Sequence, residues 1–290
     1  VATLSKGIFG FGTTGSYTAV TNLVSDAGVV AADVTGVGTA RISLAACEYG
    51  GDKGIFGYGY VAGGPVQSIT NLVSNAGVVA TDTTGVGTAR GYLSACGYGE
   101  DKGIFAYGIV SSMLSTSNLV SSSGVVATDT AGVGTARAYL AACTYGTDKG
   151  IFAYGYDGSN RVLDSNLVTN VGVVGTDNTI VGTPRAYLAA CSYGDDKGIF
   201  GYGYTASDYT AVTNLVSNLG VVASDTSGVG TPRESLEACG YANDKGIFAY
   251  GHTGASYTAI SNLVSNVGVI ATDVSGVGST RAQLAACSWG

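Results

Sequence analysis

Residues 90–136 read RGYLSACGYGEDKGIFAYGIVSSMLSTSNLVSSSGVVATDTAGVGTA, and similar phrases follow one another along the whole chain of 290 residues. The clearest marker of the phrase is a cysteine that recurs at intervals of 49, 47, 48, 48 and 48 residues. These cysteines are Cys47, Cys96, Cys143, Cys191, Cys239 and Cys287. A period of this length is typical of repeat architectures, so we expect six copies of one structural unit.

Each copy contains four short apolar segments, separated by clusters of Gly, Asp and Ser. In the quoted copy we expect strands at 90–96, 102–109, 115–121 and 124–130. Short segments rich in Val, Ile, Phe and Tyr are typical of antiparallel strands. Four strands in about 48 residues are the unit of a β-propeller. We therefore predict an all-β, six-bladed β-propeller with four antiparallel strands in each blade.

The second predicted strand has no polar face. Residues 55–60 read IFGYGY, which places Ile and two Gly on one face and Phe and two Tyr on the other. A sheet that is apolar on both faces must be covered on both. Stacked blades satisfy this because the aromatic side of one blade can pack on the glycine side of the next. A two-sheet sandwich would instead require polar outer faces.

The two ends of the chain are complementary. The first copy lacks its first strand, and the last copy stops directly after it, at RAQLAACSWG (281–290). We expect this final strand to pair with the N-terminal segment, so that one blade is built from both termini and no edge is exposed. The chain is then a single domain, 1–290, with repeats at approximately 41–89, 90–136, 137–184, 185–232, 233–280, and 281–290 plus 1–40.

The repeated order RxxLAAC, KGIFxYG, NLV and GVVATD resembles the blade of kelch-type proteins. The resemblance covers essentially the whole chain, although Tyr58-Gly59 stands where kelch blades carry a double glycine, and no Trp recurs. The phrase is most similar to kelch-like repeats of bacteriophage virion structural or tail-associated proteins. That resemblance implies a closed propeller, a virion location, and loops that bind a partner protein or a host-surface glycan.

Almost all basic residues belong to the repeat, and six of the seven Arg follow an Asp by eight residues. The Asp residues are Asp33, Asp82, Asp129, Asp177, Asp225 and Asp273, and the Arg residues are Arg41, Arg90, Arg137, Arg185, Arg233 and Arg281. We expect each Asp to pair with the Arg that opens the next first strand, because a guanidinium matches a carboxylate. The alternative is an arginine ring at one mouth of the central channel, where it would bind an anion.

The other recurring residues favour structural roles. The cysteines occupy equivalent places in different blades, too far apart for disulfides or for a shared metal ion, so we expect free, buried thiols. The six Lys fall in the turn after the cysteine strand, and five of them follow an Asp. The Asn of each NLV is expected to bond a neighbouring strand or turn.

Variation between copies concentrates between the second and third strands, and in repeat proteins such insertions often carry the binding face. We select as candidate ligand-binding residues those with aromatic or unique side chains: Tyr17, Tyr60, Tyr156, Arg161, Tyr204, Tyr209, His252 and Tyr257. Tyrosine is a rigid, amphipathic contact residue. The alternative is sequence drift in exposed loops.

Composition and motifs point away from several functions. The net charge of −7 argues against nucleic acid as a partner. No apolar run reaches the roughly 18 residues of a membrane span, and we expect no signal peptide in this chain.

The only His, and the lack of GxSxG, HExxH or phosphate-loop motifs, argue against an enzyme, a metal site or a cofactor. An acid–base pair such as Asp157 and Asp164 is weak support for catalysis, because any acidic loop offers two carboxylates. The leading hypothesis is a non-enzymatic structural or adhesive virion protein. The alternatives are a cellular kelch-type protein-interaction module and a stand-alone lectin.

Overall fold

The computed structural model describes residues 5–290, and within this range the chain forms strands, turns and loops but no helix. Residues 1–4 of the first expected repeat lie outside the described residues. The strands form seven small antiparallel sheets, six of which share one plan of a first, a second and a third strand. The predicted all-β class is confirmed. Consistently, nothing in residues 5–290 forms an apolar helix of membrane-spanning length.

The strands of the six larger sheets occupy equivalent positions in the repeat. The first strands are β4 (Ala45–Tyr49), β8 (Ser94–Tyr98), β11 (Ala141–Tyr145), β15 (Ala189–Tyr193), β18 (Glu237–Tyr241) and β21 (Ala285–Trp289). The second strands are β1 (Lys6–Gly10), β5 (Lys53–Gly57), β9 (Lys102–Ala106), β12 (Lys149–Ala153), β16 (Lys197–Gly201) and β19 (Lys245–Ala249). The third strands are β2 (Thr21–Val24), β7 (Thr70–Val73), β10 (Ser117–Val120), β13 (Asp164–Val168), β17 (Thr213–Val216) and β20 (Ser261–Val264). Three short strands complete the set: β3 (Arg41–Ile42), β6 (Tyr60–Val61) and β14 (Asn178–Thr179).

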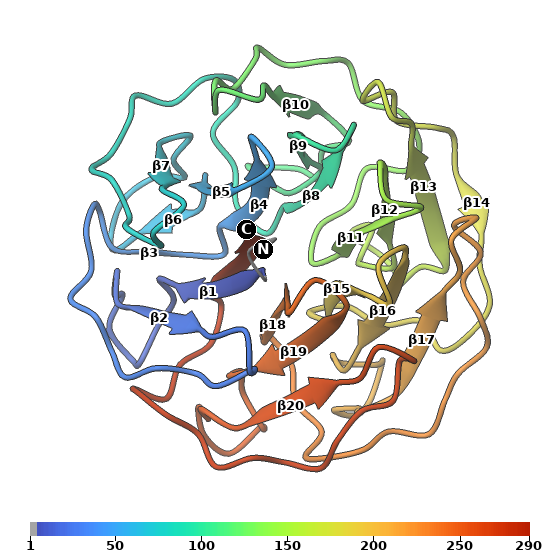
Figure 1. The fold of residues 1–290 in the computed structure, drawn as a ribbon. Coiled ribbons are helices and arrows are strands. Elements are labelled where there is room, and N and C mark those ends of the chain that lie inside the picture. Colours follow the sequence, from blue (N-terminus) through green and yellow to red (C-terminus); the bar gives the residue numbers. More distant parts are fainter. Residues whose placement is uncertain (1–4) are drawn as a thin grey trace.

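The six larger sheets are arranged around a common centre, with their first strands innermost (Figure 1). Each first strand contacts the first strands of the two neighbouring sheets, and β21 contacts β4. The two ends of the chain meet in one sheet, because β1 pairs antiparallel with β21 in a register that places Ile8 opposite Cys287. The predicted pairing of the N- and C-terminal segments is therefore present.

A ring of backbone hydrogen bonds connects all six repeats near the centre. The second residue after each repeat arginine donates its N–H to the carbonyl of the equivalent residue in the preceding repeat, over 2.8–3.0 Å. We call these residues the backbone ring: Ser43, Tyr92, Tyr139, Tyr187, Ser235 and Gln283. All six have a left-handed backbone, with φ between 53° and 59°. This conformation interrupts the first strand, which begins at Ser94 in the quoted copy and not at Arg90 as predicted.

The fourth strand of each repeat is less regular than predicted. Val120 bridges Val126 and Ser117 bridges Thr130, so the outer segment spans one residue more than β10 between the same two bridges. This extra residue is a β-bulge, and the same offset recurs in all six repeats. Because the bulge interrupts the ladder, the prediction of four regular strands is wrong except in the sheet that contains β14.

Both faces of the second strands are buried, as predicted. Ile55 and Phe56 in β5 have no exposed surface. A Cβ atom added to Gly57 would come 2.9 Å from Cζ of Phe105 in the following repeat. The aromatic face of one sheet therefore packs on the glycine face of the sheet before it.

The predicted alternation fails where the second strand ends. Tyr58 has a φ of 68°, so the backbone turns after β5. The Tyr58 ring packs on the same side as Ile55, against Phe105 with ring centroids 5.2 Å apart. Phe56 lies on the opposite side, against Phe11 at 5.1 Å. Phe56 and Tyr58 therefore do not share a face, because a left-handed residue breaks the twofold periodicity of a strand.

The six cysteines are free and buried, as predicted. Each thiol packs on the glycine that follows the repeat lysine in a neighbouring sheet, as Cys143 packs on Gly198. Burial raises the pKa of these thiols, for example that of Cys191 to about 12. The cysteines therefore act as small apolar residues between sheets.

The repeat arginines are buried and hold several segments together. Arg90 has no exposed surface. Its Nε donates to the Tyr107 carbonyl (2.7 Å), its Nη1 to the Thr88 carbonyl (3.0 Å) and its Nη2 to Oδ1 of Asn118 (2.8 Å). Its guanidinium carbon lies 4.5 Å from the centre of the Tyr58 ring in the preceding repeat.

The equivalent arginines have the same surroundings, except that Nε of Arg281 has no hydrogen-bond partner among the described residues. The alternative, an anion-binding ring at a channel mouth, does not fit the structure, because none of the six arginines has exposed surface. These residues are Arg41, Arg90, Arg137, Arg185, Arg233 and Arg281.

The aspartates contact a different arginine from the one predicted. Asp82 lies 3.9 Å from Nη1 of Arg41, which opens its own repeat, and does not pair with Arg90. Its carboxylate accepts hydrogen bonds from the backbone N–H and the hydroxyl of Thr39. Burial alone would raise the pKa of Asp82, but hydrogen bonds from Thr39 and Asn71 hold it below its ordinary value. Sequence spacing was misleading because the outer segment folds back beside the start of its own repeat.

The fully buried Asn118 joins the arginine to the bulge. Its amide accepts from Arg90 and donates to the Ala127 carbonyl (3.0 Å) and to Asp129 (2.9 Å). We predict that Asn118→Ala lowers the free energy of unfolding in urea by roughly 2–4 kcal/mol, because it leaves buried charged and polar groups unpaired. Thr128→Ala, an exposed change in the same bulge, should stay within about 0.5 kcal/mol. Equal losses in the two variants would contradict the role of Asn118.

The contact between cysteine and glycine allows a test by rescue. An added methyl group at Gly198 would collide with Sγ of Cys143. Gly198→Ala should therefore destabilise the protein by roughly 1–3 kcal/mol. In the double variant with Cys143→Ala, the loss should be smaller than the sum of the two single losses by more than about 0.5 kcal/mol. Strict additivity in urea unfolding would show that the two side chains do not compete for space.

Candidate functional site

The segments between the second and third strands form small hairpins that present variable side chains. Three consecutive repeats contain the bridges Tyr156–Arg161, Tyr204–Tyr209 and His252–Tyr257. The first member of each pair also bridges the residue after the repeat arginine, which is Ala138, Ala186 or Glu234. Each repeat thus places three residues in one row, and the composition of the rows differs from repeat to repeat. Ala138 and Ala186 are buried, whereas Glu234 is partly exposed.

Aromatic side chains from two of these repeats, together with Arg161 from the third, form one continuous surface. The Arg161 guanidinium lies 5.0 Å from the centre of the Tyr204 ring, and its Nε donates to the Tyr204 carbonyl over 3.0 Å. Ring centroids are 5.0 Å apart for Tyr204 and Tyr209, 6.2 Å for Tyr209 and His252, and 5.4 Å for His252 and Tyr257. We call these five residues the aromatic strip. Each is partly exposed, so the strip offers ring faces and polar groups to solvent.

A carboxylate that the sequence analysis missed lies beside the strip. Glu234 is half-buried and bridges His252 through the backbone. Burial raises the pKa of Glu234, while the positive charge of Arg161 lowers it and so offsets part of that rise. The signal was present in the sequence, since the equivalent residues in the other repeats are Ile42, Gly91, Ala138, Ala186 and Ala282.

A glycine supports the centre of the strip. Gly254 has a φ of 87°, and a Cβ atom there would come 2.7 Å from the Tyr209 ring. The ring of Tyr209 therefore lies directly on the backbone of the neighbouring hairpin. A side chain at residue 254 would displace it, and the left-handed backbone also disfavours any residue other than glycine.

The remaining predicted residues are not part of the strip, although Tyr156 bridges Arg161 through the backbone. Tyr156 donates its hydroxyl to the Gly158 carbonyl of its own hairpin, over 2.9 Å. The Tyr60 ring lies 5.4 Å from the Tyr92 ring between centroids. Burial raises the pKa of Tyr60, and Tyr17 adds to this rise. Tyr17 and Tyr60 therefore lie near each other, away from the strip. They adjoin a second aromatic group that the sequence analysis also missed, in which Tyr139 lies 4.4 Å from Tyr92 and 4.3 Å from Tyr187 between ring centroids.

The carboxylates considered as an acid–base pair have other surroundings. Asp157 accepts two backbone hydrogen bonds of 2.7 Å from Ser159 and Asn160 and shapes its own turn. These bonds lower the pKa of Asp157. Asp164 belongs to β13, and burial raises its pKa. Asp157 is therefore a turn residue.

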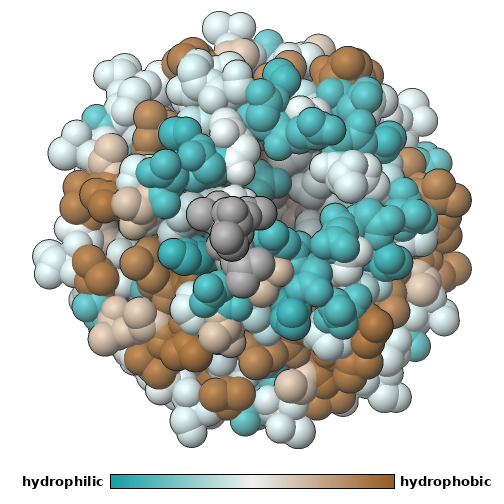
Figure 2. Space-filling view, viewed as in Figure 1, coloured by the Kyte–Doolittle hydropathy of each residue, from teal (hydrophilic) through white to brown (hydrophobic). Residues whose placement is uncertain are grey.

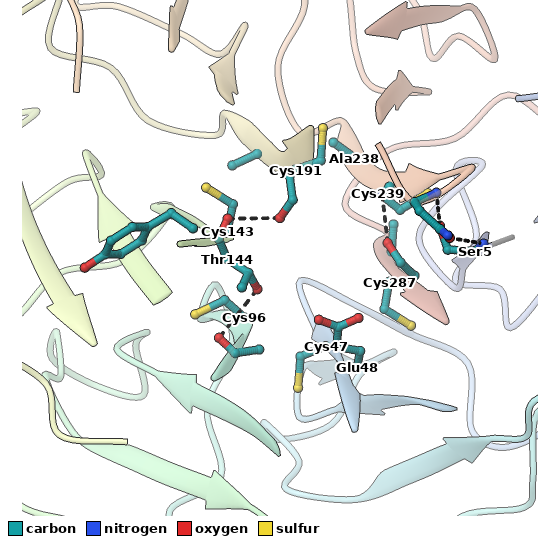
Figure 3. A pocket seen from close by; sticks show the side chains of 18 of the residues that line it. Ser5, Cys47, Glu48, Cys96, Cys143, Thr144, Cys191, Ala238, Cys239 and Cys287 are labelled. Carbon is teal, nitrogen blue, oxygen red and sulfur yellow. Dashed lines mark hydrogen bonds between the residues drawn. The ribbon is translucent and has the colours of Figure 1, made fainter. Parts of the chain in front are cut away.

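A separate cavity of about 280 Å³ lies at the cysteine ends of the first strands. Figure 3 shows Glu48 and Thr144 at this cavity, among the six cysteines. Ser192 donates its hydroxyl to the Thr144 carbonyl over 3.0 Å. Burial raises the pKa of Glu48 to about 6. Because the thiols also have raised pKa values and pack on the neighbouring glycines, they lack the thiolate character of a reactive cysteine.

Hydrophobic surface is a further feature that the sequence analysis missed. Figure 2 shows one face of the molecule, with hydrophilic residues around a central hollow and hydrophobic residues toward the periphery. The exposed apolar residues include one valine per repeat, 59–65% exposed: Val29, Val78, Val125, Val173, Val221 and Val269. These valines recur in every repeat, whereas the aromatic strip occupies three repeats. A single specific site is therefore better explained by the strip.

Comparison with known proteins adds no family assignment. No protein-family model matches the chain, and a search of curated proteins finds no significant relative. Within residues 5–290, no three His, Cys, Asp or Glu side chains are grouped in a way that would hold a metal ion. The chemistry of the strip therefore rests on its own geometry.

The pair formed by Arg161 and Glu234 can be tested through a pH titration. Arg161→Met removes the positive charge, and methionine already occupies the equivalent position 113. The pKa of Glu234 should rise in this variant, because burial is then no longer opposed by the guanidinium. Carbon-13 NMR of the side-chain carboxyl would measure the change. An unaltered pKa in Arg161→Met would show that the two groups do not interact.

Proposed function

We propose that this chain is a six-bladed, kelch-like β-propeller that binds a glycan through the aromatic strip and has no enzymatic activity. The propeller is supported by the cycle of contacts between the first strands, by the backbone ring, and by the sheet that both termini share. Six stacked sheets whose first strands surround a centre and whose apolar faces cover one another correspond to this architecture.

The observation that carries the binding proposal is the row of partly exposed rings formed by Tyr204, Tyr209, His252 and Tyr257. Sugar rings pack their C–H faces on aromatic side chains, and Arg161 and Glu234 at the margin provide a donor and an acceptor for hydroxyl groups. The backbone beneath the strip belongs to adjoining hairpins anchored to the repeat, so little ordering is required on binding.

The proposed setting is the virion of a bacteriophage, and the proposed glycan belongs to the host surface. The similarity of the repeat phrase to kelch-like repeats of phage virion proteins supports this setting. The uneven distribution of the strip over three repeats supports one extended site for an oligosaccharide. A lectin with an equal site in each blade would repeat its site residues.

The proposal is tested by binding of labelled protein to bacterial cells and to their isolated surface glycans. Tyr209→Val removes the central ring of the strip and introduces the residue found at the equivalent position 66. Loss of a central aromatic contact should weaken glycan binding by roughly tenfold or more. Tyr17→Val makes the same change at the equivalent position outside the strip and should leave affinity unchanged.

Two outcomes would contradict the glycan proposal. Failure to bind any cell or glycan would exclude receptor recognition and leave a partner protein, to be sought by pull-down. Equal losses in Tyr209→Val and Tyr17→Val would show that the strip is not the binding surface.

A further inference from the structure

A narrow central pocket lies among the residues of the backbone ring. Its wall includes one leucine from each repeat, three residues after the repeat arginine: Leu44, Leu93, Leu140, Leu188, Leu236 and Leu284. The cavity between them measures about 50 Å³, and a second cavity of about 40 Å³ lies among the alanines of the first strands. The two cavities share Leu93, Leu140, Leu188 and Glu237 in their linings. A water-sized group needs roughly 10–15 Å³, so their combined volume is sufficient for a short, unbranched chain.

One carboxylate belongs to both cavities. Glu237, the first residue of β18, is part of the lining of each. Its equivalents in the other repeats are small residues: Ala45, Ser94, Ala141, Ala189 and Ala285. Among the described residues, no cationic side chain forms an ion pair with it. Burial raises the pKa of Glu237 to about 8.

The entrance to the pocket is aromatic. Tyr92, Tyr139 and Tyr187 contribute to its lining, and consecutive rings lie 4.4 and 4.3 Å apart between centroids. The faces of such rings attract cations. Along the first strands, the lining therefore consists of tyrosine rings, leucines and a partly buried carboxylate.

We propose that this central pocket binds a primary alkylammonium group, with the alkyl chain between the leucines and the ammonium nitrogen at Glu237. The chain replaces water along an apolar wall, and the ammonium donates charge-assisted hydrogen bonds to the carboxylate. Both a lysine side chain and a free diamine have this chemistry. The site requires neither the aromatic strip nor a glycan.

Other ligand classes fit the pocket less well. A calcium ion requires six to eight oxygen ligands, whereas the first-strand positions around Glu237 are occupied by alanine and by Ser94. A neutral alkyl chain leaves the carboxylate without a counter-charge. An anion would find no cationic side chain in the lining of either cavity.

Isothermal titration calorimetry with n-butylamine tests the proposal, with n-butanol as the neutral analogue. Butylamine should bind saturably and shift the NMR methyl signals of the six leucines, and butanol should bind at least roughly tenfold more weakly. 1,4-Diaminobutane and the peptide Gly-Lys-Gly then distinguish a free amine from a lysine side chain as the source.

Substitutions that introduce the residue of another repeat at the same position separate loss of binding from loss of folding. Glu237→Ala introduces the residue found at four of the equivalent positions and should weaken butylamine binding roughly tenfold or more. Glu237→Gln, which keeps the shape and removes the charge, should show a similar loss. Glu48→Thr is the matched control at the cysteine-side cavity, because Thr144 occupies the equivalent position there. The affinity of Glu48→Thr for butylamine should equal that of the wild type.

Three results would overturn the proposal. Equal affinity for butanol and butylamine would mark the pocket as apolar only. Equal affinity in wild type, Glu237→Ala and Glu237→Gln would place any binding elsewhere. Absence of saturable binding of every amine would exclude the site.

Discussion

The buried arginine of each repeat is the interaction on which the rest of the structure depends. One guanidinium bonds the carbonyl two residues before it, the end of the second strand and the asparagine of the third strand. It also packs on an aromatic ring of the preceding repeat. Burying a cation costs several kcal/mol unless its donors are paired. The surrounding carbonyls and the asparagine are therefore needed together, which explains why these residues recur as a set.

The backbone hydrogen bonds between repeats depend on a second constraint, the left-handed backbone at the six residues of the backbone ring. This conformation directs each N–H to the carbonyl of the preceding repeat. Non-glycine residues adopt it at a cost, so the hydrogen bonds and the neighbouring packing must stabilise it. The hydrogen bonds involve only the backbone, so the side chain at these six positions can be Ser, Gln or Tyr. The three tyrosines line the central pocket.

The residues on which both proposals rest lie at positions where the copies differ. Glu234 and Glu237 replace small or apolar residues, and the aromatic strip occupies hairpins that differ from repeat to repeat. The repeated residues are used for packing: arginine and asparagine inside each sheet, and cysteine against glycine between sheets. A uniform scaffold can therefore support an asymmetric face, because the hairpins lie outside the packed layers.

The amino-acid sequence was sufficient to predict the repeat, the all-β class, the burial of both faces of the second strands, the free cysteines and the pairing of the two ends. Each of these follows from periodicity and hydrophobicity, which are properties of single segments. Three features required the three-dimensional structure. Asp82 contacts Arg41, and Tyr58 packs on the opposite face from Phe56. The rings of Tyr204, Tyr209 and His252 lie next to one another, whereas Tyr17 and Tyr60 lie elsewhere. The physical reason is that these contacts depend on left-handed residues, on a bulge and on the spatial order of hairpins, none of which changes the hydrophobic pattern.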